Sequence, residues 1–469
     1  MPKDSPLPAP IAAPIIVWLR RDLRLADQPA FHAAAAGGAP VVPVYVLDDE
    51  GAGSRALGGA SRWWLHHSLT ALDKDLRSAG SRLILRRGPV ARELVGVAKE
   101  IAAREVHALA HHESWWRKAE AEVAGMLDLH LHDGNYLGRP GTLLTGGGTP
   151  YRMFTPFWRA LEQEMPPPEP LPAPNLVAPA KWPWGDALEE WNLLPHKPDW
   201  ARGLHQAWRV GEAAAHDQLG DFLHRVGDYE TARNLPSIDG SSRLSPHLHW
   251  GELSPRQVWH ALDGRRGIGA QCFRRELGWR DFAQGLIAQF PDYGEHSFRE
   301  EYRRLAWRDP QGEAAADLVA WQQGRTGYPI VDAGMRQLWA TGWMHNRVRM
   351  IGASFLIKHL LIDWRHGERW FWDTLVDADY ASNAVNWQWV SGSGVDASLF
   401  SRIMAPLVQS PKFDAAGYIR EWVPELAGLS DADIHDPVFR PAGYPAPVIG
   451  HREARERALA AYREVKSGL

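Results

Sequence analysis

The chain contains a single cysteine, Cys272, among its 469 residues. One cysteine excludes a disulfide framework and any iron–sulfur or zinc site built from several thiolates, and we interpret Cys272 as a small buried apolar residue. Long apolar runs are also lacking, since no stretch approaches the roughly 18 to 20 residues that a membrane span requires. The proline-rich first fourteen residues lack the features of a secretion signal, so we expect a loose tail over 1–14, no membrane association and a cytoplasmic location.

A net positive charge is missing as well. The 52 Lys and Arg residues stand against 56 Asp and Glu, a formal net charge of −4, which argues against binding nucleic acid through bulk charge. A locally basic face would still contact phosphates, because charges act mainly at short range at physiological salt. After the first apolar run the chain reads RRDLRLADQPAF, without a glycine-rich phosphate fingerprint. No classical dinucleotide-binding domain is therefore expected.

The first third of the chain instead alternates strand-like and helix-like segments. Short apolar runs occupy 15–19, 41–47, 82–86 and 105–110, and apolar residues at helical intervals lie between them. Such alternation predicts a doubly wound parallel sheet with helices on both faces. We therefore place an α/β domain at 15–140.

The remainder divides into a connector and a helical region. Ten prolines between 166 and 198, with little periodicity, indicate a segment that spans rather than packs, and we place an interdomain connector at 141–204. From 205 to 469 strand signals are nearly absent and amphipathic helices follow one another. The second domain is thus predicted to be all-α.

Tryptophan is abundant in this second domain: 15 of the 24 tryptophans lie from Trp200 onward. A helical core can absorb some of them as large apolar side chains. Several stand in polar contexts, however, and four segments around them combine residue types that suit ligand binding.

Two of these segments suggest binding of an anion and of a base. GSSRLSPHLHW offers hydroxyls, an arginine and a helix start at Pro246 whose free N–H groups suit a phosphate; a capped helix start beside a solvated arginine is an equal alternative. ELGWRDF places Glu276, Trp279 and Arg280 on one helical face, where they could stack on and hydrogen-bond a base. A surface ion pair beside a core tryptophan is the commoner reading of that pattern in isolation.

The third segment, TGWMHNRVRMIGASFLIKHL, places charge on an apolar helix. Asn346, Arg349 and Met350 share one face, with Arg347 near its edge. A buried arginine requires a carboxylate partner, because an unpaired buried charge is costly. We therefore expect Arg349 to meet an acidic residue from another segment.

The fourth segment, DADYASNAVNWQWVSGSG, supplies Asp377 and Asp379 as candidate partners for that arginine. Asn383 is a short amide that could meet the edge of a heterocycle. Trp387 and Trp389 lie two residues apart, about 200° around a helix. We therefore expect Trp389 on the wall of a ligand cavity and Trp387 inside the protein, with two core tryptophans on either side of a buried helix as the alternative.

Together the motifs resemble the cryptochrome/photolyase family, and within it the photolyases of cyclobutane pyrimidine dimers. The similarity rests on RRDLRLADQPAF, PYRMFTPFWRA, SSRLSPHLHWGELSPRQ, TGYPIVDAGMRQLWATGWMHNRVRM, LIDWRHGERWFWDTLVDAD and NWQWVSGSGVDA, and runs from about 15 to 425. SRWWLHHSL and SPHLHWGEL look closer to class III photolyases and plant cryptochromes than to class I enzymes.

This resemblance implies FAD in the helical domain. Arg349 and Asp377 would pair beside the isoalloxazine, Asp379 would lie at the ribityl or ring edge, and Asn383 would face the reactive flavin nitrogen. The residues so assigned to the cofactor, including the phosphate-binding stretch, are Tyr229, Ser241, Ser242, Arg243, Leu244, Ser245, Phe273, Asn346, Arg349, Asp377, Asp379 and Asn383.

The resemblance also implies a reaction: electron transfer from excited reduced FAD to a pyrimidine dimer flipped out of DNA, with Glu276 stabilising the dimer anion. Residues assigned to the dimer and the damaged strand are Arg233, Glu276, Trp279, Arg280, Asn346, Arg347, Met350 and Trp389. Trp387, Trp364 and Trp307 would form the electron-transfer chain that reduces the flavin. Trp364 and Trp307 stand beside charged residues, as members near the surface should.

Three alternatives remain open. A cryptochrome would share fold and flavin but signal without repair; plant cryptochromes carry an aspartate where Asn383 stands, and Glu276 with Trp279 preserves the dimer-binding pair. A (6-4) photoproduct enzyme would carry a histidine-bearing pocket where this chain has Asn346 and Met350. A light-independent flavoprotein oxidoreductase lacks support, because there is no nicotinamide-binding glycine motif.

The family resemblance also raises a second, light-harvesting chromophore, methenyltetrahydrofolate or a deazaflavin. In HHESWWRKAE, the pair Trp115–Trp116 could stack a pterin, and helix packing is the alternative. The pairs His130/His132 and His247/His249 have metal-ligand spacing, but without further ligands nearby we expect no metal site. The protein is expected to act as a monomer.

Overall fold

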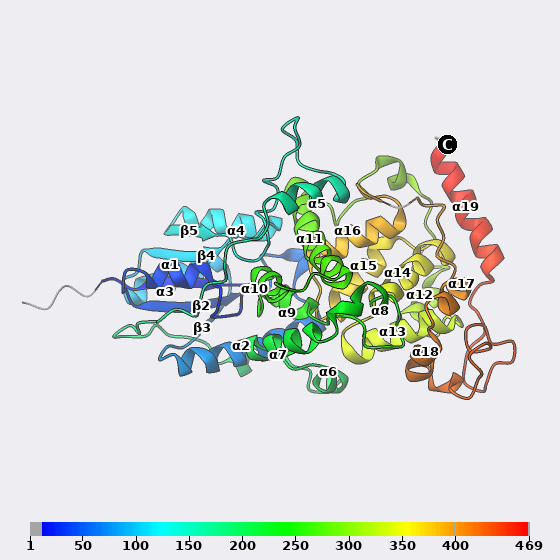
Figure 1. The fold of residues 1–469 in the computed structure, drawn as a ribbon, viewed down its shortest axis with the longest axis horizontal. Helices are drawn as coiled ribbons and strands as arrows, with labels where there is room; N and C mark the ends of the chain where they lie inside the picture. Colours follow the sequence, from blue (N-terminus) through cyan, green and yellow to red (C-terminus); the bar gives the residue numbers. More distant parts are fainter. Residues whose placement is uncertain (1–11, 398, 468–469) are drawn as a thin grey trace, which may run out of the picture.

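A computed structural model describes residues 12–397 and 399–467 (Figure 1). Most of the tail expected over 1–14 lies outside the described residues. The α/β part with its sheet lies at one end of the molecule, and the helical part fills the other, ending in helix α19 at the far edge. Within the described ranges, no helix combines the length and apolarity that crossing a membrane requires.

The α/β part is built on a five-stranded parallel sheet in the order β3-β2-β1-β4-β5. Its strands are β1 (Ile15–Leu19), β2 (Val41–Leu47), β3 (Ile84–Arg87), β4 (Glu105–Leu109) and β5 (Asp128–His132). Strands β1 and β2 are apolar throughout because helices cover both faces of the sheet. This confirms the predicted doubly wound sheet. β5 was not predicted as a strand, because DLHLH is a largely exposed edge and not an apolar run.

Two layers of helices cover this sheet. Helices α1 (Pro29–Ala35) and α2 (Gly59–Ser78) pack on the face that carries Val17 and Leu19. Helices α3 (Val90–Ile101) and α4 (Ser114–Ala124) pack on the other face, against Ile16 and Trp18. Alternate residues of one strand thus serve two separate hydrophobic cores.

The segment expected to be a connector carries two helices, α5 (Phe154–Gln163) and the start of α6 (Arg202–Ala207). Phe157, Trp158 and Leu161 of α5 belong to the core of the helical part. The proline-rich stretch that follows runs beside the sheet, where Val41 N–H donates to the Val177 carbonyl at 2.9 Å. The connector therefore packs against both the helical part and the sheet.

The rest of the described chain is helical, which confirms the predicted all-α part. Its helices are α7 (Glu212–Leu223), α8 (Tyr229–Ala232), α9 (Ser245–Trp250), α10 (Pro255–Ala261), α11 (Ile268–Gln289), α12 (Ala315–Gln322), α13 (Pro329–Thr341), α14 (Asn346–Ser354), α15 (Trp364–Thr374), α16 (Tyr380–Ser391), α17 (Pro406–Lys412), α18 (Ala416–Trp422) and α19 (His451–Ser467), with a π-helical turn at Phe355–His359. One large hydrophobic core joins them.

The two parts meet through close backbone contact and buried charge. A Cβ added to Gly58, just before α2, would lie 2.4 Å from the Cα of Asp373 at the end of α15, so only glycine fits there. Asp27 of the sheet domain pairs with Arg256 of α10 at 2.6 Å, with Asp27 fully buried. These contacts fix the sheet domain against the helices.

Candidate functional site

A cavity of about 560 Å³ lies within the helical part, between α9, α11, α14 and α16. Of the residues singled out from the sequence, it is lined by Tyr229, Arg233, Ser241, Ser242, Arg243, Ser245, Phe273, Glu276, Trp279, Arg280, Asn346, Arg347, Arg349, Met350, Asp377, Asp379, Asn383, Trp387 and Trp389. Leu244, Trp307 and Trp364 do not line it. The fold thus brings into one cavity residues of four segments that lie between Ser241 and Trp389 in the sequence.

The expected partner of Arg349 is Asp377. Arg349 Nη2 donates to Asp377 Oδ2 at 2.9 Å, and its Nε donates to the Met344 carbonyl at 2.7 Å. Ser245 Oγ donates to the same carboxylate oxygen at 2.6 Å. The other oxygen, Asp377 Oδ1, is buried and has no partner among the described residues. The pair therefore retains an unused acceptor beside the cavity.

Two histidines on the cavity wall carry unused polar atoms too. Both ring nitrogens of His249 and Nε2 of His345 are buried without a hydrogen bond in the described chain. Burial lowers the pKa of His249 to about 4, helped by Arg21, and burial with Arg347 and Arg349 lowers the pKa of His345 to about 4. Both pKa shifts favour the neutral form of the ring. Since buried polar groups are normally paired, these atoms indicate a polar ligand.

The segment before α9 places an arginine and hydroxyls at one end of the cavity. Arg243 adopts φ +54° and its guanidinium stacks on the rings of Trp208 and Trp343, at 4.7 and 5.1 Å from their centroids. Pro246 lies in the first turn of α9, as expected. Leu244 is completely buried in the core and contributes no surface to the cavity.

The face of α11 predicted to bind a base is formed as expected. Trp279 stacks on Phe154 with ring centroids 3.6 Å apart, and Glu276 forms an ion pair with Arg233. Arg280 differs from its neighbours, because its two terminal nitrogens donate to the carbonyls of Asn135 and Leu248 at 3.1 and 3.0 Å. Through these two hydrogen bonds, the guanidinium of Arg280 links α11 to the backbone at Asn135 and Leu248.

The expected division between Trp387 and Trp389 is wrong in one respect: both residues line the cavity. The cavity extends around both sides of α16, so opposite helix faces reach it. Trp387 is nevertheless almost fully buried and packs on Phe371 and Trp321, with centroids 5.0 and 6.3 Å away.

The expectation that Trp364 lies near the surface is also wrong. Its side chain is 1% exposed, and its Nε1 donates to Ser297 Oγ at 3.2 Å. The charged neighbours Asp363 and Arg365 pair with each other, while the indole turns inward. Trp307 is only partly buried.

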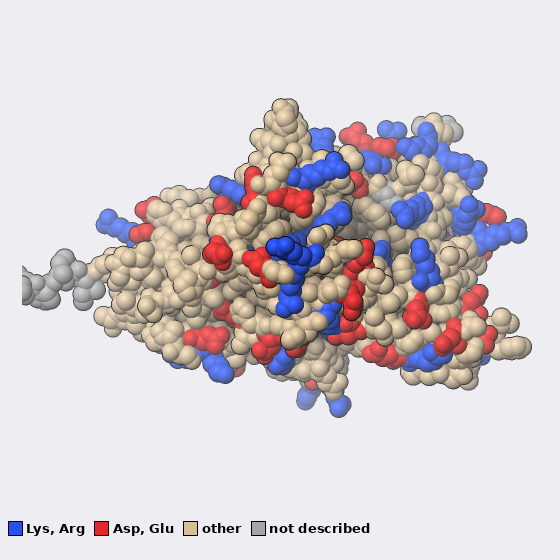
Figure 2. All heavy atoms as spheres, viewed as in Figure 1, with Lys and Arg blue, Asp and Glu red and all other residues tan. Residues whose placement is uncertain are grey.

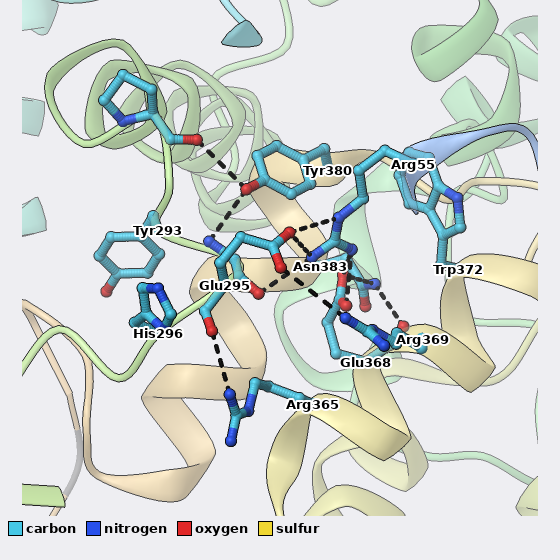
Figure 3. Close-up of polar contacts among 12 residues, drawn as sticks. Arg55, Tyr293, Glu295, His296, Arg365, Glu368, Arg369, Trp372, Tyr380 and Asn383 are labelled. Carbon is cyan, nitrogen blue, oxygen red and sulfur yellow. Dashed lines mark hydrogen bonds and ion pairs between the residues drawn. The ribbon is translucent and has the colours of Figure 1, made fainter. Parts of the chain in front are cut away.

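Asn383 belongs to a buried polar network that sequence reasoning missed (Figure 3). Its Nδ2 donates to the carbonyl and to Oε1 of Glu368 at 2.9 and 2.8 Å, and its Oδ1 accepts no hydrogen bond from the residues that the structure describes. Arg55, from the α/β part, donates to both oxygens of Glu368 at 2.8 Å and also pairs with Glu295. Burial raises the pKa of Glu368, against the opposing charge of Arg55. Glu368 lies within the LIDWRHGERW motif, whereas nothing in the sequence around Arg55 marks it.

A second, smaller cavity of about 250 Å³ lies at the carboxyl end of the sheet. Trp115 and Trp116 both line it, together with Arg20, Tyr45 and Arg55. Trp116 packs edge-on against Trp18, and Trp115 packs edge-on against Tyr380 of α16. Such a position, beyond the carboxyl ends of parallel strands, is a common ligand site in α/β folds.

Charge on the face shown in Figure 2 is mixed. Lys and Arg side chains are interspersed with Asp and Glu side chains. More of the Lys and Arg side chains lie over the helical part than over the sheet domain. This agrees with a formal net charge of −4.

Two family models match the chain: "DNA photolyase" over residues 15–175, and "FAD binding domain of DNA photolyase" over 273–464. The chain is 48% identical to a deoxyribodipyrimidine photo-lyase of Agrobacterium fabrum, over 97% of this chain and 98% of that protein. It is 35% identical to Cryptochrome-2 of Arabidopsis thaliana, over 96% of this chain and 79% of that protein.

Solved structures agree. A bacterial class III photolyase from Agrobacterium tumefaciens superposes with a TM-score of 0.93 at 46% identity, covering 99% of this chain and all of that one. An archaeal photolyase from Sulfolobus tokodaii, solved with two FAD molecules, superposes with a TM-score of 0.83 at 30% identity, covering 96% and 100% of the two chains.

The fold and the cavity define a two-domain flavoprotein. The chain belongs to the photolyase/cryptochrome family, and its helical part is the FAD-binding domain of that family.

Proposed function

We propose that this protein is a deoxyribodipyrimidine photo-lyase, a carbon–carbon lyase that uses blue light to split cyclobutane pyrimidine dimers in DNA. The observation that carries this proposal is the single cavity shared by two sets of residues. The Arg349–Asp377 pair and Asn383 line it from one side, and Glu276 with Trp279 line it from another. A cofactor and a flipped base would thus meet inside one cavity.

The residues present fit FAD. The unused atoms of Asp377, His249 and His345 are the buried polar groups that a flavin cofactor would satisfy. In our proposal Tyr229, Arg243 and the hydroxyls of Ser241, Ser242 and Ser245 hold the phosphates, while Phe273 and Asp379 complete the cofactor wall. When bound and reduced, FAD supplies an electron to the dimer on excitation and accepts it back after ring opening.

The dimer side of the cavity requires extrusion of the damaged bases from the duplex, which costs less for a damaged pair than for an intact one. Trp279 and Trp389 offer flat surfaces for stacking, and Asn346 and Met350 lie on the same wall. Glu276 would hydrogen-bond the dimer and stabilise its added charge. Residues proposed to contact the damaged strand are Arg233, Arg280 and Arg347.

Trp387, Trp364 and Trp307 are proposed as the electron-transfer chain that reduces the flavin. Trp387 borders the cavity and Trp307 is partly exposed, so the chain would lead from the cavity toward solvent. The three tryptophans carry electrons only when the flavin starts oxidised.

We propose the second cavity as the site of a light-harvesting chromophore, methenyltetrahydrofolate or a deazaflavin. Trp115 and Trp116 offer aromatic surface there. In the Sulfolobus photolyase, the presence of two FAD molecules implies a novel light-harvesting cofactor, so a relative of this fold supports such a role. We also propose that the protein acts as a monomer in the cytoplasm, which size-exclusion chromatography and cell fractionation would test.

The test of the main proposal is repair of a thymine-dimer oligonucleotide by the FAD-loaded protein with chemically reduced flavin. Recovery of thymine absorbance under blue light, and none in the dark, is the expected result. Absence of repair while FAD stays bound and photoreducible would contradict it. That outcome would favour cryptochrome-type signalling, which the 35% identity to Cryptochrome-2 keeps as the second candidate.

A further inference from the structure

Imidazole and carboxylate side chains gather at the free edge of the sheet, in the α/β part and apart from the FAD cavity. The edge strand β5 pairs in parallel with β4, placing Glu105 opposite Asp128, His107 opposite His130, and Leu109 opposite His132. Residues two apart on a strand point to the same face. Glu105, His107, His130 and His132 therefore stand together on one face of this strand pair.

Their donor atoms converge. One donor atom each from Glu105, His107 and His130 lies within 4.8 Å of the other two. Glu105 Oε1 is 2.6 Å from His107 Nε2 and 3.7 Å from His130 Nε2. Zinc with bonds of about 2.0–2.2 Å separates tetrahedral ligands by roughly 3.3 Å. The separations between the donor atoms therefore need to change by no more than about 1.5 Å for the three to surround a common ion.

A third imidazole, that of His132, orients the central ligand His107. His132 Nε2 lies 2.9 Å from His107 Nδ1, and the two rings are stacked 5.0 Å apart. A histidine that binds a metal characteristically donates its other N–H to an acceptor, which fixes its ring and tautomer. Without an ion, His107 Nε2–H donates to the Glu105 carboxylate at 2.6 Å and Nδ1 accepts from His132. A bound ion would displace the Nε2 proton, and His107 Nδ1–H could then donate to His132 while the Nε2 lone pair binds the metal.

The site is open on one side. The His107 side chain is 7% exposed, whereas those of Glu105 and His130 are 40% and 45% exposed. An ion can enter from solvent, and water can complete its coordination. Two imidazoles, one carboxylate and a water form a donor set that zinc commonly adopts.

We propose that Glu105, His107 and His130 bind one divalent first-row transition-metal ion, with zinc as the representative, and that His132 positions His107. The bound ion would link the edge strand β5 to β4. Because the ion binds the folded state, it would also stabilise that state. Nickel and copper would compete for the same nitrogen and oxygen ligands.

The experiment is equilibrium dialysis of the full-length, FAD-loaded protein, without a histidine tag, against zinc at neutral pH. Wild type should hold one zinc ion more per chain than His130→Gln or Glu105→Gln, whose half-exposed side chains can be replaced without disturbing the core. His132→Gln should weaken zinc binding by about 10- to 100-fold. His196→Gln, an exposed histidine of the connector, is the matched control and should bind as wild type.

Thermal unfolding and crystallography give independent readouts. Zinc should raise the melting temperature of wild type and of His196→Gln, but not that of His130→Gln. An anomalous zinc peak should appear between Glu105, His107 and His130. Equal zinc binding by wild type and His130→Gln, a zinc peak elsewhere, or no zinc bound at millimolar concentration would overturn the proposal and leave these histidines as ordinary edge-strand residues.

Discussion

Two ion pairs balance the charge of two arginines on the cavity wall. Arg349 is neutralised by Asp377, whereas Arg233 is neutralised by Glu276, so each side of the cavity has its own ion pair. Beside the Arg349–Asp377 pair one carboxylate oxygen has no partner among the described residues, whereas Glu276 is engaged by Arg233. A ligand that hydrogen-bonds Glu276 must therefore compete with Arg233.

Replacing Glu276 by Ala should impair dimer repair while FAD remains bound, because Glu276 lies on the α11 face of the cavity and the cofactor pair lies elsewhere. A hydrogen bond to a charged group is worth about 1.5–3 kcal/mol, so dimer affinity should fall roughly tenfold or more. Titration with a dimer-containing oligonucleotide measures the affinity, and the repair quantum yield and flavin absorbance of the same samples measure repair and bound FAD. Glu276→Gln, which keeps one hydrogen-bonding oxygen, should lose less; an unchanged quantum yield in the Ala variant would remove Glu276 from its assigned role.

Trp387→Phe should block photoreduction of oxidised flavin but spare repair once the flavin is reduced chemically. The reason is that phenylalanine keeps the packing on Phe371 but is far harder to oxidise than tryptophan. Flavin absorbance under blue light measures photoreduction, and the oligonucleotide assay measures repair. Normal photoreduction in this variant would show that electrons reach the flavin by another route.

Arg55→Met should destabilise the protein by about 3–5 kcal/mol, the usual cost of removing one partner of a buried ion pair. The side chain of Glu368 is fully buried and Arg55 binds both of its oxygens. Urea unfolding of the FAD-loaded protein measures the loss. Arg369→Met is the control (Figure 3), since Arg369 is mostly exposed and 3.9 Å from Glu295, and exposed pairs contribute only about 0–1 kcal/mol. Equal losses in the two variants would contradict the prediction.

At the scale of elements, helix packing sets the position of Trp387. A Cβ on Gly367 of α15 would lie 2.1 Å from Cη2 of Trp387 on α16. The two helices therefore touch where the proposed electron-transfer chain begins, and the indole is clamped between α15 and its own helix.

Gly367→Ala should therefore cost about 1–3 kcal/mol, as overpacking of a core does, and should shift Trp387 and slow photoreduction. Gly352→Ala on α14 is a matched control, because nothing lies within 4 Å of its added Cβ, and it should gain about 0.5–1 kcal/mol. Thermal unfolding and photoreduction rates test both variants. A Gly367→Ala variant with wild-type stability and photoreduction would mean that α15 and α16 can move apart without a cost in stability.

The apolar pattern of the sequence predicted some strands and helices correctly but not others. The strands Ile15–Leu19 and Val41–Leu47 are where the apolar runs predicted them, because strands covered on both faces must be apolar throughout. β5 was missed because an edge strand with exposed histidines has no such run. Helix α5 lies in the segment 141–204 that the prolines of 166–198 indicate as a connector, whereas its apolar residues pack on helices far away in sequence.

The whole molecule carries a net charge of −4, so binding of DNA must depend on local contacts. Affinity for a dimer-containing duplex should fall with salt, with a slope of about 0.9 per phosphate contact. Arg347→Ala should lower the magnitude of that slope by about 1. Arg452→Ala on α19 removes the same charge from an exposed site at the edge of the molecule and should leave the slope unchanged. Equal slopes for both variants would mean that Arg347 touches no phosphate.

The sequence by itself determined the class of fold, the family and most of the cavity. Apolar periodicity follows from burial, and long motifs keep residues such as Glu276 and Asn383 at recognisable spacings. Only the tertiary structure decided which charges meet. Arg55 and Glu368 are 313 residues apart, and the inward turn of Trp364 depends on Ser297. The packing of two domains and several helices determines which residues meet, and local sequence patterns do not reveal these contacts.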